Sequence, residues 1–329
     1  MGTKGFLISR LIQMVITFLI ILTGLFFLFR LALPDPTAAL VVEGLSAEEQ
    51  AMLRARFGLD LPLWQQYFVY LGNFFQGDFG MSFHYRADIS YIIGEKILNT
   101  LVLMVPAFIF SYLIGPILGV LLSWRRGSKG EYTGIVVGLF LRSAPVFWTG
   151  MIFIMLFGIW LGIFPTSGMR TLPYEAAGFL DKIFTLDFLW HLFLPALTIS
   201  LYYLALPMLI MRNTMLEVMG EDFIELCKAK GLGERATMFK HAARNALLPV
   251  VTQAAITVGL AVGGMVVVEV VFSWPGLGRE LVQAVRTGDY PMAQAGFMLM
   301  AGIILLMNFL ADIVYGYLDP RVAYKREGS

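Results

Sequence analysis

The chain has 329 residues, of which 58% are hydrophobic and only 14% charged, and its formal net charge is +1. Its mean hydropathy of +0.75 excludes an ordinary soluble domain and is typical of a protein that crosses a membrane several times. We expect contact with membrane lipid and no nucleic-acid partner.

Six apolar stretches are long enough to cross a bilayer. A helix needs about 20 apolar residues to span about 30 Å of hydrocarbon. The stretches are Leu11–Leu33, Asn99–Ser123, Gly134–Gly162, Trp190–Met211, Pro249–Phe272 and Met292–Leu318. The sequence therefore predicts an all-α integral membrane protein with six transmembrane helices.

The segments that join these stretches differ in charge. Fourteen basic residues fall on the side that holds both termini, and eight fall on the other side. Cytoplasmic segments of membrane proteins carry the excess of lysine and arginine. We therefore predict that both termini are cytoplasmic.

A long polar segment, residues 34–98, separates the first two stretches on the outer side. Ser46-Ala47-Glu48-Glu49 has the form of a capping box, and it predicts a helix that Gly58 closes. A second helix is predicted over Pro62–Phe75, where aromatic residues are frequent. This segment is either a cap packed on the helix bundle or a surface that receives a soluble partner.

Three pairs of glycines lie four residues apart within the apolar stretches. They are Gly115 and Gly119, Gly134 and Gly138, and Gly259 and Gly263. Glycines at this spacing allow neighbouring membrane helices to approach closely.

The segment Glu217–Pro249, which we name the basic loop, is polar although it lies between two apolar stretches. Two helical patterns in it are interrupted by Gly231-Leu232-Gly233. Such an angled projection suits a groove on a partner protein. An amphipathic helix lying on anionic headgroups is the alternative.

The chain lacks the motifs of common catalytic sites. Its three histidines are scattered, and neither a His-Glu-x-x-His pair nor a Gly-x-Ser-x-Gly elbow is present. A phosphate-binding loop needs a Gly-Lys dipeptide, which is absent. We expect a chain without a catalytic site, metal site or bound cofactor.

Four polar side chains inside the apolar stretches are candidates for the path of a solute, because such residues are costly in a membrane. Arg142 either faces a cavity or forms a structural pair or snorkels to the inner surface. Asn308 and Asp312 share a helix face, which favours hydrogen bonds inside the bundle. Glu269 either lines an exit or holds the turn that follows it.

Several motifs together resemble one transporter family. The basic loop resembles the cytoplasmic "EAA" loop of binding-protein-dependent ABC importers. The dipeptide and oligopeptide permeases of that group are similar in motifs along nearly the whole chain. These are Ala229-Lys230-Gly231-Leu232, Arg244-Asn245-Ala246-Leu247-Leu248-Pro249, Gly77-Asp78-Phe79-Gly80-x-Ser82, Phe272-Ser273-Trp274-Pro275-Gly276-Leu277-Gly278 and Asp289-Tyr290-Pro291.

This resemblance implies a type I importer fold and a B-type subunit of the bacterial cytoplasmic membrane that works by alternating access. It implies four further subunits beside this chain: a related C-type permease subunit, two cytoplasmic ATPase subunits that hold ATP and Mg²⁺, and an extracytoplasmic substrate-binding protein. It also implies that the ATPases contact Asp222, Glu225, Ala229, Lys230, Gly231, Leu232, Glu234 and Arg235.

The predicted layout has four parts: the first helix (1–33), the outer segment (34–98), a five-helix core (99–318) containing the basic loop, and a tail (319–329). Peptides are the expected cargo, and nickel, glutathione or another peptide-like solute is the alternative within the family. A membrane scaffold or receptor is the alternative from another class.

Overall fold

The computed structural model describes residues 3–32, 60–173 and 185–318, with the single positions 46, 48, 52 and 183. The described residues form helices and turns, and their one β-type contact is an isolated bridge between Met81 and Asp88. The predicted helix between Ser46 and Gly58 lies outside the described ranges, and so does the tail.

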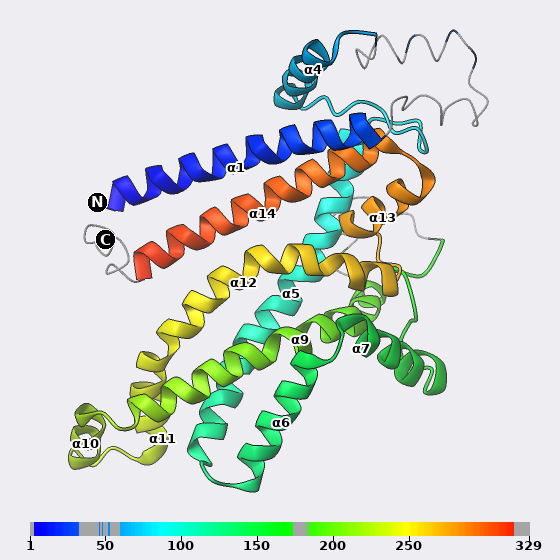
Figure 1. The fold of residues 1–329 in the computed structure, drawn as a ribbon. Coiled ribbons are helices and arrows are strands. Elements are labelled where there is room, and N and C mark those ends of the chain that lie inside the picture. The colour runs from blue at the N-terminus through cyan, green and yellow to red at the C-terminus, as the bar shows by residue number, and fades with distance from the viewer. Residues whose placement is uncertain are drawn as a thin grey trace.

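The helices run in the following order (Figure 1): α1 (Thr3–Ala32), α4 (Leu63–Gln76), α5 (Ile89–Trp124), α6 (Lys129–Ser143), α7 (Val146–Phe153), the π-helix η1 (Ile154–Trp160), α9 (Leu186–Val218), α10 (Asp222–Ala229), α11 (Glu234–Ala236), the π-helix η2 (Thr237–Ala242), α12 (Ala243–Val271), α13 (Leu277–Thr287) and α14 (Tyr290–Leu318). Helix α1 packs on α14, α14 on α12, and α12 on α9, which packs on α5. The start of α1, the end of α14 and the short helix α10 lie at one end of the bundle, and α13 lies at the other.

Four helices in the described part are long and apolar enough to cross a membrane: α1, α5, α9 and α14. The α6 and α7 helices add a fifth span if the bent pair is counted as one. Helix α12 coincides with the remaining predicted stretch, and the side chains of residues 259–265 within it lie outside the description. The count of six spans therefore stays a prediction.

The third apolar stretch is not the single helix that was expected. Helix α6 ends at Ser143, Ala144 is extended with ψ 133°, and α7 begins after Pro145. The two halves differ in direction by 103°. Proline lacks the N–H that a continuing helix needs and disfavours the helical conformation at the residue before it. Hydropathy does not reveal this break between α6 and α7, because both halves are apolar.

The second span begins ten residues earlier than predicted, at Ile89. The charged residue Lys96 lies before the predicted start. In the structure its ammonium group lies 3.1 Å from a carboxylate oxygen of Glu280 in α13. This ion pair lets the helix continue through a charged position.

Helices α5 and α9 are in close contact at Gly115 and Gly119, as the glycine spacing predicted. A Cβ atom at Gly119 would lie 2.5 Å from the carbonyl oxygen of Met208. A Cβ atom at Gly115 would lie 2.9 Å from the carbonyl oxygen of Leu204. Both obstacles are backbone atoms of α9, so the distance between the two helices depends on the missing side chains.

Gly119→Ala is therefore expected to destabilise the bundle by about 2 kcal/mol, because overpacking forces the backbones apart. Thermal unfolding of the purified protein in detergent would show a lower midpoint. Gly94→Ala is the matched control in the same helix, since a Cβ at Gly94 meets nothing within 4 Å. An unchanged midpoint for Gly119→Ala would contradict the close packing.

The second predicted outer helix is confirmed within one residue at each end. Helix α4 follows Pro62 and ends at Gln76, and Gly77 caps it with a φ of +74°. Its Tyr67 hydroxyl lies 2.8 Å from the hydroxyl of Thr23 in α1. The Phe74 ring lies 5.6 Å from the ring of Phe18. Helix α4 is thus packed on the bundle, as in the first of the two interpretations.

Candidate functional site

The basic loop is a folded projection anchored in the bundle. Ile224 of α10 is fully buried, and it packs in a cluster with side chains from α5, α9, η2 and α12. Met215 and Met238, at 0% and 2% exposure, belong to the same cluster. Burying a side chain of this size contributes about 1.5–3 kcal/mol. The loop therefore has a fixed position at the end of α9.

A tight turn at Gly231 joins the two halves of the loop. The N–H of Gly231 donates to the carbonyl of Lys228 (2.9 Å), and the N–H of Leu232 donates to that of Cys227 (3.2 Å). This pair of bonds is the Schellman motif that ends many helices. It requires a left-handed residue, and Gly231 has φ +74°.

All eight residues predicted to contact an ATPase lie exposed on this projection. Glu225 and Lys230 extend from the first half, while Glu234 and Arg235 follow the turn. Leu226 and Leu232 add exposed apolar surface, at 55% and 38% exposure. The exposed residues are Asp222, Glu225, Ala229, Lys230, Gly231, Leu232, Glu234 and Arg235. The structure thus brings the predicted set together on one surface of mixed charge.

Trp124, at the end of α5, contacts the second half of the loop and was missed by the sequence analysis. Its indole N–H donates to a carboxylate oxygen of Glu234 at 2.9 Å. The guanidinium of Arg235 lies 6.0 Å from the centre of the indole ring. The Phe239 ring is 6.2 Å away. These contacts connect the loop to the second span. The one signal for them in the sequence is a tryptophan at the end of a predicted helix.

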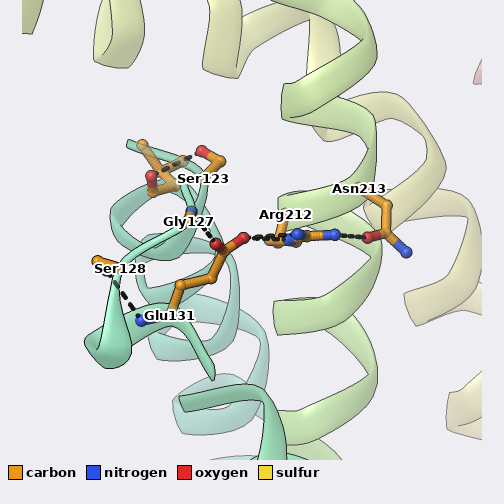
Figure 2. Close-up of polar contacts among 7 residues, drawn as sticks. Ser123, Gly127, Ser128, Glu131, Arg212 and Asn213 are labelled. Carbon is orange, nitrogen blue, oxygen red and sulfur yellow. Dashed lines mark hydrogen bonds and ion pairs between the residues drawn. The ribbon is translucent and has the colours of Figure 1, made fainter. Parts of the chain in front are cut away.

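A buried ion pair joins α6 to α9 at the same end of the bundle (Figure 2). Two guanidinium nitrogens of Arg212 lie 2.9 and 2.5 Å from one carboxylate oxygen of Glu131. The other oxygen accepts the N–H of Gly127 at 2.6 Å. Ser128 caps α6 by accepting the N–H of Glu131. The α5–α6 turn is therefore fastened to α9 about one and a half turns before α9 ends.

Glu269, a candidate for the solute path, is fully buried at the opposite end of the bundle. One of its carboxylate oxygens accepts the hydroxyl of Thr100 (2.6 Å), and the other accepts the N–H of Arg279 (2.9 Å). A carboxylate at this place stabilises the first turn of α13. The arrangement holds the turn between α12 and α13.

Removing the charge in Glu269→Gln is expected to loosen that turn. The part-buried N–H of Arg279 would lose a charged acceptor, at a cost of about 1.5–3 kcal/mol. Trypsin should then cleave the folded protein faster after Arg279, which lies in α13. Cleavage at an unchanged rate would contradict the role of Glu269 in the turn.

Two further path candidates lie on α14. Asp312 pairs with Arg10 of α1, with a guanidinium nitrogen 3.4 Å from a carboxylate oxygen. Asn308 is half-buried one turn earlier on the same helix. These contacts join the first and last helices of the chain.

Two motifs far apart in sequence meet near α13. The buried carboxylate of Asp289 accepts the hydroxyl of Ser82 and the N–H groups of Phe83 (3.2 Å) and His84 (3.1 Å). It also accepts the N–H of Met292 in the first turn of α14 (3.3 Å). One aspartate thus holds the outer segment against α14.

Family models match almost the entire chain. "Binding-protein-dependent transport system inner membrane component" matches residues 111–324, and the N-terminal model of the same transport systems matches residues 4–109. This chain belongs to that family. The permease is therefore a subunit of a binding-protein-dependent ABC importer, and other subunits of the importer hydrolyse ATP.

Curated relatives cover the permease from end to end. The dipeptide transport system permease protein DppB of Escherichia coli K12 is 37% identical over 97% of this chain and 99% of the relative. The oligopeptide transport system permease protein AppB of Bacillus subtilis is 38% identical over 96% and 99%. The di/tripeptide permease DppB of Pseudomonas aeruginosa is 37% identical over 98% and 99%.

A solved structure with the same fold is an inward-facing methionine ABC transporter, MetNI. It covers 70% of the permease and 97% of that chain, with a TM-score of 0.54 at 19% identity. The permease therefore has the type I importer fold, in agreement with the prediction.

Proposed function

We propose that the permease moves di- and oligopeptides inward across the bacterial cytoplasmic membrane by alternating access. The chain is 37–38% identical over nearly its full length to permeases named for dipeptide and oligopeptide transport. Both termini and the basic loop face the cytoplasm in this proposal, in accord with the excess of basic residues there.

The basic loop is the element that receives the conformational change of the ATPases. The observation that supports this role is a folded projection anchored by Ile224, with eight exposed residues that include charges of both signs. Its second half touches Trp124 of α5, and α9 leads directly into its first half. A displacement of the loop would thus reach two membrane helices.

The working complex contains a C-type permease subunit, two ATPase subunits and an extracytoplasmic substrate-binding protein. This chain contributes no catalytic residue and binds no cofactor in the proposal, because ATP and Mg²⁺ lie on the ATPases. Coupling requires that the loop contact two ATPase states with different free energies.

Copurification tests the assembly. The permease, expressed with its presumed partner subunits, should copurify with the ATPases, and added binding protein loaded with peptide should stimulate ATP hydrolysis. Proteoliposomes should accumulate labelled peptide only with ATP inside the compartment that the basic loop faces. Stable partner binding without any nucleotide-dependent change would favour a scaffold or receptor instead.

A further inference from the structure

Polar and aromatic side chains from four helices meet halfway across the bundle. Tyr202 is the middle residue of α9, and Thr257 is the middle residue of α12. Arg142 lies near the end of α6, about 20 Å along the helix from its start. Tyr112 comes from α5, and its hydroxyl lies 3.0 Å from that of Thr257. We name Tyr112, Arg142, Tyr202, Tyr203 and Thr257 the central cluster.

The guanidinium of Arg142 belongs to this cluster. Its central carbon lies 4.3 Å from the centre of the Tyr202 ring, within the distance of a cation–π contact. The side chain thus lies against the ring of Tyr202 in the middle of α9, which favours the cavity-facing interpretation over snorkelling.

One nitrogen of Arg142 lacks a hydrogen-bond partner. Nη1 is buried, and no atom of the described chain accepts a hydrogen bond from it. Arg142 also forms no ion pair with a described carboxylate. A buried charged donor without an acceptor is costly in a medium of low dielectric constant. The cluster therefore offers a donor that a negatively charged group would satisfy.

The other members of the cluster suit a site that a small molecule enters. The side chains of Tyr112, Tyr202 and Tyr203 are only partly buried. The rings of Phe108 and Tyr112 are stacked at 4.8 Å, and Gln253 donates to the Thr257 hydroxyl at 3.1 Å. Rigid aromatic surfaces with a few polar groups are typical of ligand sites.

We propose that the central cluster binds the terminal carboxylate of a transported peptide. This inference rests on the peptide cargo proposed above. A guanidinium presents its N–H groups in a planar fork that matches a carboxylate, and the resulting bonds are charge-assisted. Stacking on Tyr202 holds that fork in place, and the free Nη1 is one of its donors.

The experiment compares two peptides in the assembled transporter with its binding protein in proteoliposomes. The probes are trialanine and trialanine amide, and uptake is divided by the amount of each that the binding protein holds. Arg142→Gln should lower uptake of trialanine about tenfold, as expected for the loss of a charge-assisted bond. Uptake of the amide should stay within about twofold.

Arg286→Gln is the matched control, because it makes the same change at an exposed arginine of α13, outside the central cluster. It should leave both uptakes within about twofold. If Arg142→Gln does not assemble, Arg142→Lys takes its place. Lysine keeps the charge without the fork and should lower trialanine uptake by a smaller factor than glutamine, again without changing that of the amide.

A second measurement is the labelled trialanine retained by the complex arrested with an ATP analogue. Retention should fall with Arg142→Gln while binding-protein-stimulated ATP hydrolysis persists. Equal losses for both peptides, or joint loss of retention and hydrolysis, would overturn the inference in favour of a structural role, such as pairing with an acidic side chain of the second permease subunit. No change would also overturn it. Uptake of neither peptide by the unmodified transporter would overturn the peptide cargo, and this inference with it.

Discussion

Replacing Gly231 by proline is expected to leave the helix bundle assembled and to separate ATP hydrolysis from transport. Proline cannot reach φ +74° and has no N–H to donate to the carbonyl of Lys228. It also disfavours the conformation of Lys230, at φ −76° and ψ 2°. The exposed residues after the turn would then point elsewhere. Uptake should fall about 5- to 150-fold, the range of a coupling free energy of about 1–3 kcal/mol.

Two alanine variants make this experiment specific to the turn. Gly233 has φ −64° and ψ 152°, which any residue adopts, and its Cβ position is open. Gly233→Ala should therefore transport at the original rate. Gly231→Ala retains the N–H but strains the left-handed conformation by about 1–2 kcal/mol, so its uptake should lie between the two. Full peptide uptake by the Gly231→Pro variant, with the complex intact, would contradict the coupling role of the turn.

The sequence predicted those parts of the fold that depend on neighbouring residues. Pro62 and Gly77 bound α4 because each acts on the backbone where it stands. The tight turn of the basic loop follows from Gly231 in the same way. Contacts between residues distant in sequence could not be predicted. Lys96 lies within α5, which begins at Ile89, and its partner Glu280 is distant in sequence.

In the candidate site, too, local features could be predicted and long-range contacts could not. Exposure of the eight loop residues could be predicted, since charge and glycine keep a segment at the surface. The contacts that fasten the loop to the bundle could not. Arg212 counted only as one inner positive charge until Glu131 was found beside it. Trp124 likewise gained a role only when the fold placed it next to Glu234.

Glu131→Gln is expected to have the second large effect, on the stability of the bundle. The change leaves the guanidinium of Arg212 without its carboxylate and weakens the acceptor of the Gly127 N–H. Breaking a buried ion pair from one side costs about 3–5 kcal/mol. We expect the lower end of this range, because 23% of the Arg212 side chain is exposed. Thermal unfolding followed by tryptophan fluorescence measures the loss.

The matched control separates the ion pair from the cap of the same helix. Ser128→Ala removes the side chain that accepts the N–H of Glu131, and it should cost only about 1 kcal/mol. A decrease as large as that of Glu131→Gln would attribute the effect to the start of α6 and not to its connection with α9.

Combining Glu131→Gln with Arg212→Gln should restore part of the stability, since removing both charges leaves no buried charge without a partner. The double variant would then be more stable than the sum of the two single losses allows, by about 0.5–3 kcal/mol. Additive losses would mean that the two side chains act independently. The double variant could also recover its unfolding midpoint and yet lose ATP-driven uptake. That result would show that packing of α6 on α9 is not enough, and that this ion pair is needed for movement of the basic loop to reach the membrane helices.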